Sequence, residues 1–157
     1  MKVILAGIAL AATAASMNTI EPGNWATTVV MTDITLSPEA PPEITQAVQA
    51  SLGGEGTTSE SCLTQQDVDE GPTSIFNNAG DDCEYSDLTM DGGVIRGSAV
   101  CESPTGPVNV VMEGTYGPTS YAMTVNVDGD MGGGMGPMSL EMAISGERLG
   151  DCAEEEA

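Results

Sequence analysis

Hydrophobic and polar positions alternate regularly along the last third of the chain. Val108, Val110 and Met112 alternate with residues of the opposite face, and the same spacing recurs over 121–127 and 138–144. A period of two places successive side chains on opposite faces of a strand. Each segment therefore predicts an antiparallel strand with one buried face.

The first half of the chain predicts shorter elements. The Thr- and Val-rich segment 25–34 and the segment 55–62 are typical of strands, and 64–67 is typical of a helix N-terminus followed by one or two turns. Between them, Ile44, Ala47, Val48 and Leu52 recur at helical spacing. We therefore expect a short amphipathic helix over 42–52, laid on an open side or end of the sheet, and a loop over 70–82.

Residues 83–101 predict a hairpin centred on Gly92. Cys83 and Cys101 lie equally far from this glycine, so a three-residue loop at 91–93 places the two sulfurs opposite each other. The apolar residues of the hairpin are divided between both faces, which indicates a bulge or two covered faces.

These elements together predict a mainly β protein. About seven strands with tight turns favour an antiparallel meander. Because such a sheet has one apolar face, it must curve or be covered, so we expect a strongly curved sheet or a flattened barrel with one short helix.

The N-terminus has the composition of an export signal. A short basic start at Lys2 precedes an uncharged apolar run over 3–15 that ends in small residues. We therefore expect a signal peptide over 1–16, a single domain over 17–153 and an acidic tail over 154–157. No later segment is long and apolar enough to predict membrane insertion after signal removal.

Four cysteines in an exported chain predict two disulfides. The hairpin geometry selects Cys83–Cys101 from the three possible connectivities, which leaves Cys62 to pair with Cys152. No Cys-x-x-Cys motif indicates a redox-active pair, so both bonds are expected to be structural.

Charge excludes several functions. The formal net charge is −21, and after Lys2 the only basic residues are Arg96 and Arg148, so a nucleic-acid groove is excluded. The chain has no histidine, which removes the usual catalytic triads and zinc sites. Glu113 and Glu141 could form an acid pair, but both fall on the polar faces of their strands. We therefore expect no enzyme and no cofactor.

Two segments are weak candidates for metal binding. Asp128 and Asp130 flank a glycine and could offer oxygen ligands to calcium, although a hairpin turn is the simpler interpretation. Thioethers recur over 131–142 and could bind Cu(I), although side chains on an apolar strand face are expected to fill the core. These residues are Met131, Met135, Met138 and Met142.

Several separated segments resemble a known family. They are Glu-Pro-Gly-Asn-Trp at 21–25, Cys-Leu-Thr at 62–64, the spaced pair Cys83 and Cys101, and Ile-Ser-Gly-Glu-Arg-Leu-Gly-Asp-Cys at 144–152. Together they resemble the domain-of-unknown-function family 3617, small exported proteins of Gram-negative bacteria. The resemblance implies a periplasmic location and four paired cysteines, and it brings no known activity.

Two hypotheses on function follow. The first is a non-enzymatic periplasmic protein whose curved sheet binds a small apolar ligand or presents a face to an envelope protein. The second is a Cu(I) or calcium binder that uses the segment Met131–Met142 or the acidic loops.

Overall fold

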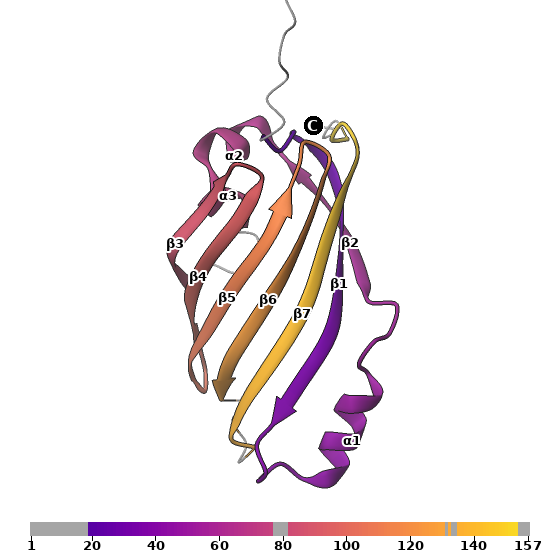
Figure 1. Ribbon diagram of the computed structural model, residues 1–157, viewed down its shortest axis with the longest axis vertical. Coiled ribbons are helices and arrows are strands. Elements are labelled where there is room, and N and C mark those ends of the chain that lie inside the picture. Colours follow the sequence, from indigo (N-terminus) through magenta and orange to yellow (C-terminus); the bar gives the residue numbers. More distant parts are fainter. Residues whose placement is uncertain (1–18, 77–81, 131, 133–134, 154–157) are drawn as a thin grey trace, which may run out of the picture.

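The computed structural model describes residues 19–76, 82–130, 132 and 135–153. In this part of the chain, seven antiparallel strands form one sheet in the order β2-β1-β7-β6-β5-β4-β3 (Figure 1). The strands are β1 (Gly23–Leu36), β2 (Thr57–Leu63), β3 (Cys83–Asp91), β4 (Val94–Ser103), β5 (Gly106–Tyr116), β6 (Ser120–Asp130) and β7 (Pro137–Gly150). The helices are α1 (Pro42–Ala50), α2 (Gln65–Glu70) and α3 (Pro72–Phe76). The predicted antiparallel β class is confirmed.

The strand order explains why the sheet is curved and open. Strands β3 to β7 form a meander, and β1 then pairs with β7 on one side and with β2 on the other. Pairing of β2 with β3 would close the ring, but these two strands are the edges of the described sheet. The connection between them contains α2 and α3 instead of a tight turn. Of the two predicted forms, the curved sheet is therefore the one adopted.

One face of the sheet, here called the inner face, carries apolar residues in rows that cross the strands. The register places residues of neighbouring strands directly opposite each other, so each row is continuous. The first two rows are Val29, Ile144, Met123, Gly114, Ile95 and then Met31, Met142, Val125, Met112, Gly97. The next two are Ile34, Leu140, Val127, Val110, Ala99 and then Leu36, Met138, Gly129, Val108, Cys101.

A bulge explains the mixed pattern of the hairpin. The β3–β4 register shifts between Ser86 and Thr89, and Asp87 adopts a positive φ of 53°. Met90 consequently lies opposite Ile95 on the inner face, and a Cβ atom at Gly97 would crowd the side chain of Leu88. The predicted bulge is therefore present, and it brings the apolar residues of β3 to the inner face.

Helix α1 forms where it is expected, but its apolar face is not buried. None of its residues is buried, and Ile44 remains 37% exposed. Thr45, Gln46 and Gln49 line the hollow between the helix and the end of β1. The expected packing of its apolar face is therefore only partly present, since Val48 and Leu52 are half-buried whereas Ile44 and Ala47 are exposed. Helical periodicity identifies the apolar face of a helix, but the connections to β1 and β2 decide where that face points.

Helices α2 and α3, between β2 and β3, pack against the inner face at one end of the sheet (Figure 1). Ile75 and Phe76 of α3 and Val68 of α2 pack on the core cluster. This cluster consists of Ile20, Trp25, Leu63, Ile95 and Tyr116. The prediction of a loop over 70–82 is therefore wrong at Pro72–Phe76, and 77–81 lie outside the described residues. The sequence of α3 has no charge pattern or heptad repeat that would predict a helix. This short helix depends on packing against the core.

Both disulfides join the cysteines that the sequence pairs. Cys83 and Cys101 lie opposite each other on β3 and β4, with their Cα atoms 4.0 Å apart. Cys62 at the end of β2 bonds Cys152, just after β7, with a Cα separation of 5.4 Å. Because β1 lies between β2 and β7, the second bond crosses the end of β1.

Removing the Cys62–Cys152 bond should destabilise the protein more than removing Cys83–Cys101. The two bonds span 90 and 18 residues, and the chain-entropy model assigns them about 4.5 and about 3 kcal/mol. Urea unfolding of Cys62→Ala/Cys152→Ala and of Cys83→Ala/Cys101→Ala measures both losses. A larger loss for the hairpin pair would contradict the ranking of the two bonds by loop length.

Candidate functional site

A cavity lies on the inner face, between the sheet and the segment that contains α3. Its volume is about 400 Å³, within the range of small-molecule sites. Ile75 and Phe76 form the helical wall, and Val29, Met123 and Ile144 form part of the sheet wall. Among the described residues that line this cavity, none carries a charged side chain. The cavity is therefore suited to an apolar ligand.

Trp25 is a buried residue of the cavity wall. Its side chain is 3% exposed, and its indole Nε1 donates a hydrogen bond of 3.0 Å to the carbonyl oxygen of Glu21. The indole ring lies 5.6 Å from the ring of Tyr121, centroid to centroid, at a tilt of 32°. The hydrogen bond and the ring contact together fix the orientation of the indole.

The side chain of Tyr121 extends from β6 across β7 and reaches β1. Thr27, Gly146 and Tyr121 lie opposite one another on β1, β7 and β6. A Cβ atom at Gly146 would overlap the Tyr121 ring, so the glycine allows the ring to lie flat across β7. The Tyr121 hydroxyl thereby reaches Thr27 Oγ1 at 2.7 Å. Burial raises the pKa of Tyr121, and the hydrogen bond with Thr27 opposes this in part.

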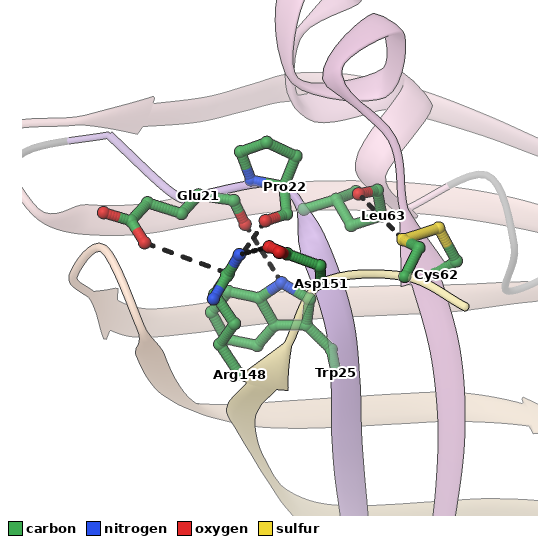
Figure 2. A network of polar contacts seen from close by, with 8 residues as sticks. Glu21, Pro22, Trp25, Cys62, Leu63, Arg148 and Asp151 are labelled. Carbon is green, nitrogen blue, oxygen red and sulfur yellow. Dashed lines mark hydrogen bonds and ion pairs between the residues drawn. A yellow bond between two sulfur atoms is a disulfide. The ribbon is translucent and has the colours of Figure 1, made fainter. Parts of the chain in front are cut away.

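Arg148 joins the start of β1 to the end of β7 (Figure 2). Its Nε donates a hydrogen bond of 2.8 Å to the carbonyl oxygen of Pro22, and its Nη2 pairs with Asp151 at 2.8 Å. Glu21 lies 3.8 Å away across a longer ion pair. A Cβ atom at Gly23 would overlap this guanidinium and the carbonyl of Gly150, which explains the glycine. The Arg148 contacts therefore hold the segment that carries Trp25.

The Cys62–Cys152 bond lies beside the same network. Cys62 and Leu63 both line the cavity. Cys152 Sγ is 3.8 Å from the Leu63 carbonyl oxygen (Figure 2), a contact and not a hydrogen bond because a disulfide sulfur carries no hydrogen. The bond fixes the end of β2 and hence the adjacent wall.

Local hydrogen bonds hold the helical wall in place. Thr64 and Asp67 form a reciprocal capping box at the start of α2, and hydrogen bonds from the Thr64 side chain and backbone lower the pKa of Asp67. The Tyr85 hydroxyl donates to the Phe76 carbonyl at 3.1 Å, and burial raises the pKa of this tyrosine. Strand β3 thus supports α3 directly.

The candidate soft-metal ligands that the structure describes lie on β7 and in the connection before it. Met138 and Met142 lie in inner-face rows, opposite Leu36 and Met31 of β1. Met135 lies in the connection before β7, where its backbone N–H donates to Gly132. Met131 lies outside the described residues. The methionines of β7 therefore belong to the apolar surface of the sheet, as core filling requires.

Asp128 and Asp130 are strand residues and not the expected hairpin turn. Both belong to β6, where Asp128 accepts a hydrogen bond from Ser139 and Asp130 accepts one of 2.8 Å from the Gly132 N–H. The strand continues because Asp128 and Asp130 pair with Ser139 and Pro137 of β7. The described residues contain no group of three or more His, Cys, Asp or Glu that could hold a metal ion.

Other surface features are less suited to binding. A broader hollow of about 710 Å³ is lined mostly by small or polar residues such as Ala26, Thr28 and Ser145. Glu113 and Glu141 lie on β5 and β7 with β6 between them, and Glu141 accepts a hydrogen bond of 3.0 Å from Thr32. The inner-face cavity is therefore the candidate site.

Three of the four segments that carry the family resemblance meet around this site, whereas the pair Cys83 and Cys101 lies toward the other end of the sheet. Residues 21–25 supply Trp25 and the acceptors for Arg148, and 144–152 supply Arg148, Gly146 and Cys152. A family model described as "Protein of unknown function (DUF3617)" matches residues 20–152. The chain belongs to the DUF3617 family. No curated protein and no solved structure matches it. The match covers all ten strands and helices of the described fold.

Sequence reasoning missed the hydroxyl pair and the helical wall. Thr27 and Tyr121 appeared only as strand residues, and Ile75 and Phe76 fell in a predicted loop. One signal could have indicated the pair: Gly146 continues the alternating apolar series of β7, and a glycine in such a position suggests close approach by another group. The described part of this DUF3617 protein contains no helix long and apolar enough to cross a membrane.

Replacing Arg148 should destabilise the protein, whereas the same charge change elsewhere should not. Arg148→Met leaves the Pro22 carbonyl without its donor, and charge-assisted hydrogen bonds are worth about 2 kcal/mol. Arg96→Met is the matched control, because Arg96 is exposed on β4. Urea unfolding compares the two variants. Equal losses would show that net charge matters and that the Arg148 contacts do not.

Proposed function

We propose that this DUF3617 protein is an exported, non-enzymatic binding protein of the periplasm that holds a small apolar molecule on the inner face of its sheet. The observation that carries the proposal is the uncharged cavity of about 400 Å³, whose walls come from α3 and from several strands of the sheet. Apolar walls with a few convergent polar groups are typical of ligand sites.

The inner face continues the apolar surface beyond the cavity. Val29, Met123 and Ile144 form the cavity wall and also the first of the four apolar rows. Many residues of the later rows are only half-buried, including Met31, Val127 and Leu140. Apolar surface that the chain itself leaves partly uncovered favours a ligand, because burial contributes about 25 cal/mol per Å².

The remaining sequence and structural features support the proposed compartment. Two disulfides are typical of oxidising environments, and the first sixteen residues have the composition of an export signal. The acidic surface favours solubility and opposes binding to anionic membranes. A docking surface for an envelope protein has less support. The face of the sheet opposite the inner face exposes few large apolar side chains, among them Val94, Val100 and Val111.

A neutral apolar probe should bind the wild-type protein with one-to-one stoichiometry. Trp25 is the only tryptophan and lines the cavity, so energy transfer from it to N-phenyl-1-naphthylamine reports binding there. Val29→Phe should weaken binding about tenfold, equivalent to about 1.4 kcal/mol, because the ring occupies the cavity. Val111→Phe makes the same change at a residue that is 46% exposed on β5 and should leave binding unchanged. No saturable binding to wild type, or equal binding by both variants, would reject the proposal.

A further inference from the structure

A row of hydroxyl groups lies at the boundary between the Trp25 end of the cavity and the apolar rows. Ser59, Thr27 and Tyr121 come from β2, β1 and β6, and the register places them in line through Gly146. In the next row toward the other end of the sheet, Thr57 of β2 lies opposite Val29, and from Val29 onward the row is apolar. All three hydroxyl residues line the cavity. A molecule bound along the inner face would therefore meet hydrocarbon over most of its length and hydroxyls at one end.

One of the two hydroxyl hydrogens of Thr27 and Tyr121 is not used in the hydrogen bond between them. Two hydroxyls carry two hydrogens, and their mutual bond of 2.7 Å uses one of them. Among the described residues, neither hydroxyl has a second hydrogen-bond partner. Both side chains are only partly buried, so this hydrogen can be donated to water or to a ligand. A ligand oxygen placed at this row would supply an acceptor.

Charge restricts what the acceptor can be. Among the described cavity-lining residues there is no cation, and Arg148 is already bound to Pro22 and Asp151. An ionised carboxylate or phosphate at the hydroxyl row would be buried without a counter-ion. The formal net charge of −21 would repel it further. The ligand oxygen is therefore uncharged.

We propose that the site selects an amphiphile with one uncharged oxygen acceptor, such as an ester, ketone, ether or alcohol, at the end of a hydrocarbon chain. The oxygen accepts a hydrogen bond from the Thr27–Tyr121 pair, and the chain lies along the apolar rows from Val29, Met123 and Ile144 onward. This inference rests on the proposed function and adds the polarity and charge of the ligand to it.

The test measures how dodecyl compounds displace N-phenyl-1-naphthylamine, which has no oxygen, at pH 8. Methyl dodecanoate and 1-dodecanol should displace it from the wild-type protein at concentrations about tenfold or more below those needed for dodecanoate, which is ionised. Equal potency of dodecanoate and methyl dodecanoate would overturn the inference.

The variant Thr27→Val/Tyr121→Phe removes both hydroxyls and keeps the shapes of the side chains. It should lower the affinity for methyl dodecanoate about two- to tenfold, the range for one net hydrogen bond, and leave the affinity for the naphthylamine probe unchanged. Thr124→Val, on the exposed face of β6, is the matched control and should change neither affinity. Unchanged binding of methyl dodecanoate to the double variant would refute the role of the hydroxyls.

Different results would reject the proposed function and the assignment of the ligand. If the wild-type protein does not bind the naphthylamine probe, the proposed function itself is wrong. If the probe binds but the ester shows no preference that depends on Thr27 and Tyr121, only the assignment of an uncharged oxygen-bearing ligand is wrong.

Discussion

The contact between Arg148 and the Pro22 carbonyl holds the first strand of the sheet against the last. It joins segments 126 residues apart in a chain that has only two other basic residues. The same short segment holds the indole of Trp25 through the Glu21 carbonyl. Loss of the Arg148 contact would therefore loosen both the β1–β7 pairing and the part of the cavity wall that Trp25 forms. The Cys62–Cys152 bond reinforces the same end from β2.

The cavity exists because the sheet does not close. Strand order 2-1-7-6-5-4-3 is that of an up-and-down barrel opened between β2 and β3. Helices α2 and α3 occupy the connection at this opening, and α3 contributes Ile75 and Phe76 to the cavity wall. These helices cover one end of the inner face and leave many residues of the later apolar rows half-buried. An apolar surface of this kind is unfavourable in water, and a bound hydrocarbon would reduce that cost.

The sequence predicts the local elements better than their arrangement. Alternation in β5, β6 and β7 and the mirror placement of Cys83 and Cys101 identify strands, faces and one disulfide, because period and register are local properties. The packing of α3 and the partly exposed apolar face of α1 depend on chain connections that periodicity does not encode. The hydroxyl row is harder still to predict, since Thr27 and Tyr121 meet only through the β1–β7–β6 register and the missing side chain of Gly146.

Native mass spectrometry of the protein purified gently from its own cells tests the central claim, an uncharged apolar ligand on the inner face, most directly. We expect a bound neutral molecule that contains oxygen and a hydrocarbon chain, present on the wild-type protein and depleted on Val29→Phe. Two results would contradict the proposed ligand. One is a mass equal to that of the disulfide-bonded chain without any ligand, in both the wild type and Val29→Phe. The other is a bound molecule that Val29→Phe retains.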